Sequence, residues 1–147
     1  MLILAGCGGD GQSNQHWQTV TRQGVHFRAP ADWEVTVANG RTTARDGASF
    51  VQVATFPLVK RYDDALFDQV ARELTVRMRA VAAQTGGQVT GTSTVTAAGI
   101  RSHAYDVTVG DHVDQYTFVL RGKREYQLLC SAQETVCARL LTSFDAG

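Results

Sequence analysis

Cys7 is the residue whose surroundings most clearly indicate covalent chemistry. It follows Leu4, Ala5 and Gly6, and this tetrapeptide matches the bacterial lipobox, after which a lipoprotein signal peptide is cut. The chemistry requires a thiol that accepts diacylglycerol through a thioether, and small residues before it so that the chain fits the modifying enzyme and the peptidase. The pattern therefore predicts that Cys7 becomes a lipid-bearing N-terminus. A buried N-terminal strand over residues 1–5 is the alternative interpretation.

The residues before Cys7 are too few for a complete signal peptide. Only Met1, Leu2, Ile3 and Leu4 remain of an apolar segment that normally spans about 7 to 15 residues behind a basic one. We therefore expect that the start codon is placed too late or that the sequence is truncated. Residues 1–7 are then a residual signal peptide with its lipobox. Residues 8–16, rich in Gly, Ser, Asn and Gln, predict a flexible tether, and residues 17–147 one folded domain.

Two further cysteines, Cys130 and Cys137, are left when Cys7 serves as the anchor. In an exported protein an even remainder of cysteines predicts a disulfide. Cys130 ends a strand pattern and Cys137 opens a helical one, so this bridge would join the last strand to the last helix. A redox pair is the alternative, because a thiolate at a helix N-terminus is activated. The spacing differs from Cys-X-X-Cys, however, and no βαβ pattern surrounds it.

A second group of residues that could do chemistry surrounds a predicted turn. Asp111, His112 and Asp114 lie beside the turn, and His103 and Asp106 lie on the preceding strand-like segment, opposite them across a hairpin. His112 and Asp114 would share one strand face, close enough to bind a cation or support acid–base catalysis. The alternative is a polar hairpin tip in solvent, with His103 partly packed among tyrosines. We adopt the latter and assign no metal ligand and no catalytic residue.

Hydrophobic alternation predicts two groups of strands that position these residues. The first group comprises Val25–Ala29, Trp33–Ala38, Arg41–Arg45 and Ala48–Leu58. The second group comprises Val89–Ala97, Arg101–Val109, Val113–Arg121 and Glu125–Cys130. Short turn signals such as Asn39-Gly40 separate neighbouring strands, so we expect antiparallel pairing. Strands before and after a central helix suggest a single sheet.

A long helix is predicted between the two strand groups, from about Asp63 or Asp64 to Ala83. Its apolar residues recur at intervals of three and four: Leu66, Phe67, Val70, Leu74, Met78 and Val81. We interpret the acidic residues of its first turn as helix capping and not as a cation site. A short closing helix has an apolar side formed by Leu140, Leu141 and Phe144. Helices packed on an antiparallel sheet make an α+β fold, here an αβα sandwich.

The charge balance and the hydropathy of the sequence limit the kinds of partner that we expect. The 147 residues carry 14 basic and 14 acidic side chains, so no global field draws the chain to nucleic acid or to anionic lipid. No stretch approaches the roughly 20 apolar residues of a membrane-spanning helix. Membrane attachment is therefore expected to come from the lipid on Cys7, and two or more acyl chains would suffice for it.

The order of the predicted elements resembles a known fold. Phe27, Pro30, Ala31, Asp32 and Trp33, then the hairpin, the long helix, the four-strand meander and a final Ser143-Phe144, are similar to the PsbP-like fold. Within that fold the chain resembles the small bacterial lipoproteins of the DcrB and LpqN families, from about His16 to Phe144. The resemblance implies an αβα sandwich whose members are mostly non-enzymatic extrinsic subunits, assembly factors and envelope lipoproteins. It carries no catalytic residue over.

Three hypotheses about function follow. The first is a non-enzymatic lipoprotein of the cell envelope, outside the cytoplasm, that binds or scaffolds a protein or lipid partner and needs no cofactor. The second is a carrier of an apolar ligand, which requires a cavity between sheet and helix and would be recognised by co-purified lipid. The third, least favoured, is an enzyme with a site near His103 and His112, for which perturbed ionisable residues in a deep pocket would be required.

Overall fold

The computed structural model describes residues 15–146, which form nine strands and two helices. The strands are β1 (Trp17–Arg22), β2 (Val25–Pro30), β3 (Glu34–Ala38), β4 (Arg41–Asp46), β5 (Ser49–Pro57), β6 (Gln88–Ala97), β7 (Ile100–Val109), β8 (His112–Arg121) and β9 (Arg124–Ser131). The helices are α1 (Phe67–Gln84), preceded by a 3₁₀ turn (Asp64–Leu66), and α2 (Glu134–Ser143). Cys7 and the predicted tether up to residue 14 lie outside the described residues.

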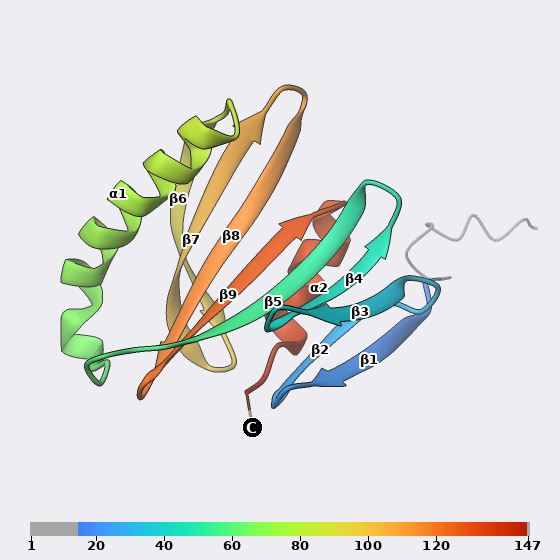
Figure 1. The fold of residues 1–147 in the computed structure, drawn as a ribbon, viewed down its shortest axis with the longest axis horizontal. Helices are drawn as coiled ribbons and strands as arrows, with labels where there is room; N and C mark the ends of the chain where they lie inside the picture. Colours follow the sequence, from blue (N-terminus) through green and yellow to red (C-terminus); the bar gives the residue numbers. More distant parts are fainter. Residues whose placement is uncertain (1–14, 147) are drawn as a thin grey trace, which may run out of the picture.

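Seven strands form one antiparallel sheet in the order β3-β4-β5-β9-β8-β7-β6. Helix α1 links β5, near the middle of this sheet, to β6 at its edge (Figure 1). Consecutive strands elsewhere are joined by tight turns, and Asn39 and Gly40 at one of them have positive φ angles of 54° and 73°. These are the angles that a two-residue hairpin turn requires, and Asn and Gly adopt them at low cost.

The expectation of a single sheet is correct for the strands from β3 onward and wrong for the segment Val25–Ala29. That segment belongs to β2, which pairs with β1 in a separate two-stranded sheet. The hairpin meets the C-terminus through an isolated bridge in which His26 and Asp145 exchange two backbone hydrogen bonds of 2.8 and 2.9 Å. The hairpin does not pair with a strand of the seven-stranded sheet. Apart from this bridge, it is attached to the domain mainly by side-chain packing against the sheet and α2.

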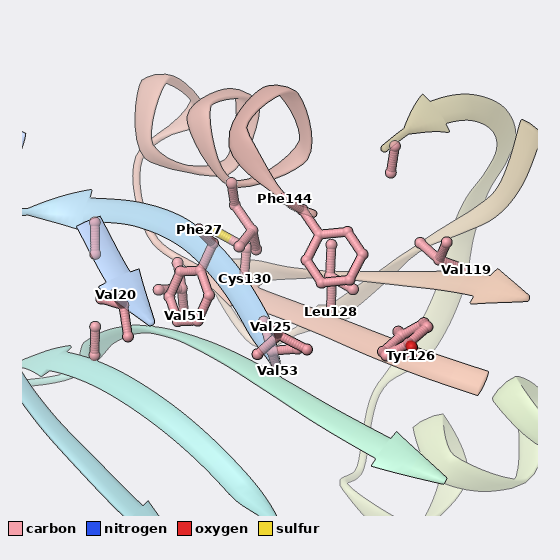
Figure 2. Packing of buried hydrophobic residues seen from close by; sticks show 14 of the residues in the cluster. Val20, Val25, Phe27, Val51, Val53, Val119, Tyr126, Leu128, Cys130 and Phe144 are labelled. Atoms are coloured by element: carbon pink, nitrogen blue, oxygen red, sulfur yellow. The ribbon is translucent and has the colours of Figure 1, made fainter. Parts of the chain in front are cut away.

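The seven-stranded sheet is covered on both faces, as the α+β prediction requires. Helix α1 packs over β6 and β7 on one face, whereas α2 and the β1–β2 hairpin lie on the other (Figure 1). Side chains alternate accordingly, so that on β8 Phe118 joins the cluster under α1 and Val119 the cluster under α2. Figure 2 shows the larger cluster, in which Phe27 from β2 lies among side chains of β5 and β9.

Helix α1 buries part of the predicted apolar stripe, because Leu66 lies in the preceding 3₁₀ turn and is 37% exposed, and Val70 and Val81 are only half-buried. Phe67, Leu74, Met78 and Ala82 are its buried residues. Asp63 caps the preceding 3₁₀ turn, because its carboxylate accepts a 2.8 Å hydrogen bond from the backbone N–H of Ala65, whereas α1 itself has no side-chain cap at Leu66. Neither helix of residues 15–146 combines the length and apolarity that a bilayer crossing needs.

Candidate functional site

One end of the molecule is built from two segments that are distant in sequence. The link between β5 and α1 lies against the β8–β9 turn, because Leu58 N–H donates to the carbonyl of Lys123 (2.8 Å) and Tyr62 N–H to that of Gly122 (2.7 Å). The turn itself needs Gly122, whose φ is +59°. Residues 58–62 and 121–124 therefore form a single surface, which we call the link–turn end.

A groove of about 380 Å³ opens between this end and the N-terminal half of α1. Its apolar lining consists of Leu58, Val59, Leu66, Val70, Leu74 and Leu120, and its polar lining of Lys60, Arg61, Tyr62, Gln69, Glu73, Arg77 and Glu125. Burial raises the pKa of the Tyr62 phenol above its usual range, and the nearby Asp64 carboxylate adds to the increase. The volume lies within the range of small-ligand pockets.

Glu125 is a buried carboxylate with three hydrogen bonds. Arg77 Nη1 donates to its two oxygens at 3.2 and 3.0 Å, and Gln127 Nε2 donates to Oε2 at 2.8 Å. The Arg77 guanidinium also lies over the Phe118 ring, 5.7 Å from its centroid. Because Glu125 accepts three hydrogen bonds and its charge is paired with Arg77, it serves to hold α1 on the sheet and is poorly placed to act as a general base.

Replacing Arg77 by methionine is expected to lower the free energy of unfolding by about 2 kcal/mol, because the buried Glu125 carboxylate then lacks its cation. The Arg77 side chain is 47% exposed, which keeps the effect below that of a fully buried pair. Urea denaturation measures it, with Arg79→Met on the exposed side of the same helix as the matched control. Equal losses in the two variants would show that the pairing contributes nothing.

A second hollow, of about 660 Å³, lies beside the groove and shares Arg61 with it. Four basic residues line it: Arg61, Arg121, Lys123 and Arg124. No carboxylate is found among its described lining residues. These basic residues were not singled out from the sequence, although the two short basic runs at residues 60–61 and 121–124 are a signal that points to them.

His103 lies on β7 and is buried at 6% exposure. Its Nε2–H donates to the Phe67 carbonyl (3.0 Å), and its ring stacks on the Phe67 ring at 3.8 Å. The Arg101 guanidinium also lies over the Phe67 ring, 3.8 Å from its centroid. Burial lowers the pKa of His103 below 6.5, and the Arg101 guanidinium lowers it slightly further. The hydrogen bond to Phe67 and the Asp68 carboxylate raise it, but they do not offset the effect of burial. The residue is a neutral component of the core.

The expected proximity of His103 to the Asp111–Asp114 turn is wrong. His103 pairs with Phe118, whereas His112 pairs with Val109. His112 and Phe118, the partner of His103, are therefore six positions apart on β8, roughly 20 Å along an extended strand. Asp106 pairs with Gln115 and so projects from the face of the sheet opposite to His112 and Asp114. His103 and Asp106 are thus kept away from the turn, because the register of β7 and β8 determines which side chains meet.

His112 and Asp114 do approach each other at the open end of β8. His112 Nε2 lies 3.6 Å from Asp114 Oδ1, and His112 Nδ1 lies 4.0 Å from Asp111 Oδ1. The His112 side chain is 54% exposed. Among residues 15–146, no three His, Cys, Asp or Glu side chains are grouped so as to hold a metal ion. His112 is therefore exposed at the hairpin tip, whereas the Asp114 side chain is 18% exposed with a buried Oδ1, and the ring stacked on His103 is that of Phe67.

The dependence of stability on pH tests whether His103 is buried and neutral in the folded protein. Because its folded-state pKa lies below the unfolded value of 6.5, the unfolded chain binds a proton first as the pH falls. The stability that neutral His103 contributes is therefore complete above about pH 7 and is lost as the pH drops through 6.5 toward the folded pKa. Thermal midpoints between about pH 7.5 and 5.5 should fall less steeply for His103→Gln than for wild type. His112→Gln, at the exposed histidine, should retain the wild-type slope, and an unchanged slope in His103→Gln would refute the argument.

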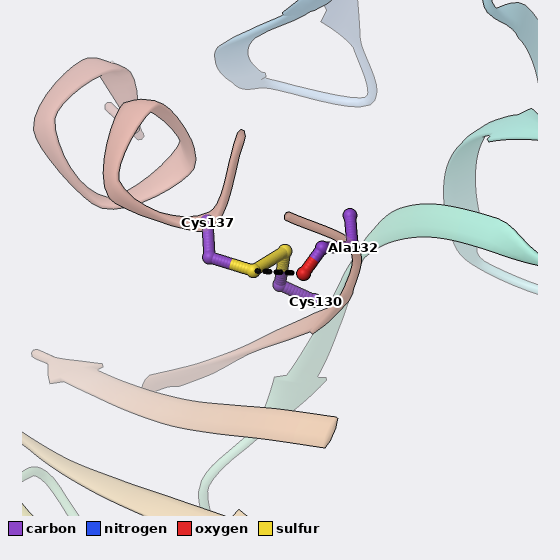
Figure 3. Close-up of a disulfide and its surroundings, with 3 residues drawn as sticks. All are labelled: Cys130, Ala132 and Cys137. Atoms are coloured by element: carbon purple, nitrogen blue, oxygen red, sulfur yellow. Dashed lines mark hydrogen bonds between the residues drawn. A yellow bond between two sulfur atoms is a disulfide. The ribbon is translucent and has the colours of Figure 1, made fainter. Parts of the chain in front are cut away.

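The disulfide predicted from the cysteine count is present. Cys130 on β9 and Cys137 on α2 are joined, with their Cα atoms 5.6 Å apart (Figure 3). Cys137 Sγ lies 3.7 Å from the Ala132 carbonyl oxygen, a van der Waals contact because a disulfide sulfur carries no proton. Helix α2 begins at Glu134, three residues before the predicted start, so Cys137 lies within its first turn. Cys130 is 1% exposed, which favours a structural bridge over a redox pair.

Comparison with solved structures identifies the fold. The chain is similar to the solution structure of cyanobacterial PsbP (CyanoP) from Synechocystis sp. PCC 6803, with a TM-score of 0.64, 16% identity and coverage of 98% of this chain and 99% of that one. It is also similar to a crystal structure from Bacteroides thetaiotaomicron VPI-5482, with a TM-score of 0.56, 9% identity and coverage of 84% of this chain and 45% of that one. Neither a family model nor a curated protein matches it by sequence. The chain has a PsbP-like fold.

Proposed function

We propose that this protein is a non-enzymatic lipoprotein, anchored outside the cytoplasm through Cys7, that binds or scaffolds a protein or lipid partner of the bacterial cell envelope. The disulfide between Cys130 and Cys137 is the main observation that supports a location outside the cytoplasm, because disulfides persist in oxidising compartments. The lipobox pattern Leu4–Cys7 supports the same location independently. The PsbP-like fold is compatible with this role.

The state of the ionisable groups supports binding over catalysis. Glu125 is paired with Arg77, and His103 is buried and donates to a backbone carbonyl. His112 is exposed at a hairpin tip, far from both. General acid–base catalysis needs such groups to converge on one substrate atom, and the described residues keep these three apart. The hollows at the link–turn end are suited to holding a partner.

Metabolic labelling tests the anchor. The chain is expressed behind a lipoprotein signal peptide in bacteria that are supplied with radiolabelled palmitate, next to Cys7→Ala. Wild type is expected to carry label and to sediment with membranes, whereas Cys7→Ala should carry none. The Cys130→Ala/Cys137→Ala variant is the control, since it removes two other thiols and should keep the label. Equal labelling of wild type and Cys7→Ala would overturn the proposal.

A second candidate function, carriage of an apolar ligand, is favoured by the groove beside α1. The groove lies between helix and sheet and has six apolar lining residues. If it carries lipid, organic extracts of the purified protein contain a stoichiometric lipid by mass spectrometry. Val70→Trp would fill the groove and remove that lipid, whereas Val76→Trp, on the exposed side of α1, would retain it. Protein purified without lipid would eliminate this candidate.

A further inference from the structure

The link–turn end gathers positive charge that the rest of the molecule does not show. Lys60, Arg61, Arg121, Lys123 and Arg124 are all exposed there, and they include both lysines of the chain. The backbone hydrogen bonds of Leu58 and Tyr62 to the β8–β9 turn hold the two basic segments together. A chain with no net charge therefore has a cluster of five basic side chains at this end, beside the carboxylates of Asp63 and Asp64 that follow the link.

This charge is not neutralised by ion pairs. In the part of the chain that the structure describes, the ion pairs of Arg77 and Arg101 engage Glu125 and Asp64, and none involves the five basic residues. The hollow that four of them line contains no described carboxylate. Like charges at this spacing repel one another and do not stabilise the fold. Their clustering is instead complementary to an anionic partner.

An exposed apolar tip adjoins the basic residues. Val59 is 96% exposed, the highest value among the large hydrophobic residues of the described chain, and directly precedes Lys60 and Arg61. Leu66, 37% exposed, lines the same groove. An apolar side chain flanked by cations suits the boundary between lipid headgroups and acyl chains, where the cations meet phosphates and the apolar group leaves water.

We propose that the link–turn end docks on the surface of a bilayer that contains anionic phospholipid, with the five basic side chains on headgroup phosphates and Val59 inserted beneath them. The inference rests on the proposed location at a membrane and supplies a contact that is independent of Cys7. Figure 1 places the β5–α1 link at one end of the long axis and the start of β1, which follows the predicted tether, toward the other, and β1 then runs back so that Gln23 borders the basic hollow. Anchoring at one end and docking at the other would fix the orientation of the domain.

Vesicle co-sedimentation tests the proposal with the purified full chain carrying Cys7→Ala, so that no acyl chain contributes. It should bind vesicles of phosphatidylglycerol mixed with phosphatidylcholine at low salt, release them at high salt, and not bind pure phosphatidylcholine. Lys123→Gln/Arg124→Gln should weaken binding by roughly tenfold or more. Val59→Ser should weaken it by about threefold, since the buried apolar area is lost.

The matched controls change the same residue types elsewhere. Arg28→Gln/Arg79→Gln removes two exposed arginines away from the link–turn end, and Val76→Ser alters an exposed valine of α1 that is 69% exposed. Both should bind as wild type does. Equal losses in test and control variants, equal binding to the two kinds of vesicle, or binding to polyglutamate but not to vesicles would overturn the proposal. Palmitate labelling of Cys7 is measured separately, so failure of the anchor and failure of the docking surface are distinguishable.

Discussion

Phe27→Ala is expected to lower the free energy of unfolding by about 4 kcal/mol. Phe27 is 1% exposed and lies in the larger core cluster, between the β1–β2 hairpin and the seven-stranded sheet (Figure 2). The hairpin forms its own sheet, so side-chain packing of this kind is its main attachment. Domains of this size have total stabilities of about 5–15 kcal/mol, so the substitution should leave the domain marginally folded.

Urea denaturation, followed by tryptophan fluorescence, measures the effect of Phe27→Ala. Trp17 and Trp33 both pack against the same cluster and so report on this region. Val76→Ala, at an exposed position of α1, is the control and should change the stability by less than about 0.5 kcal/mol. If Phe27→Ala unfolds at the wild-type urea concentration, the hairpin does not contribute to the cooperative core.

Removing the disulfide is expected to cost about 2.5 kcal/mol in the chain-entropy model, because the bridge closes a loop whose ends are 7 residues apart. Cys130→Ala/Cys137→Ala is the variant of choice, since alanine introduces no polar atom at the buried Cys130. The bridge ties α2 to β9, so its loss should loosen α2 first. Urea denaturation of the variant, and of wild type with and without reductant, measures the difference.

The third cysteine supplies the control for the disulfide. Cys7→Ala in the unacylated chain should leave the stability unchanged and the effect of reductant intact. Intact-mass analysis of exported protein should show a mass two hydrogens lower than that of the reduced chain. Two free thiols in the exported protein would contradict both the disulfide and the proposed location.

Local pattern was sufficient to predict most of the elements. The three- and four-residue spacing of apolar side chains located α1, and alternation with turn residues located β3 to β9. The hairpin of β1 and β2 is the exception. Its turn residues, Gln23 and Gly24, have φ angles of 53° and 79°, but Gln-Gly is a weaker turn signal than Asn-Gly. The pattern therefore located β2 as Val25–Ala29 but missed β1, and it did not assign the two strands to a second sheet.

The candidate site was largely hidden from sequence reasoning, because its parts are far apart along the chain. Arg77 and Glu125 are 48 residues apart, and no local spacing indicates their pairing. The same holds for the basic surface, which depends on contact between residues 58–62 and 121–124. Conversely, the histidines that looked adjacent on a predicted hairpin are separated by the register of β7 and β8.

The residues alone were enough for features that depend on short-range chemistry. These are the hydrophobic spacing that marks a helix or strand, the residues of tight turns, the even number of cysteines left after Cys7, and the lipobox that ends at Cys7. Charge is different, because its effect depends on positions in space. A composition of 14 basic and 14 acidic side chains is neutral as a sum, yet folding brings five of the basic ones to one end. Coulomb interactions fall off with distance and are screened within about 10 Å in salt, so a partner at that end experiences the local cluster and not the total. Strand register and long-range packing, which no local pattern encodes, determine where that cluster forms.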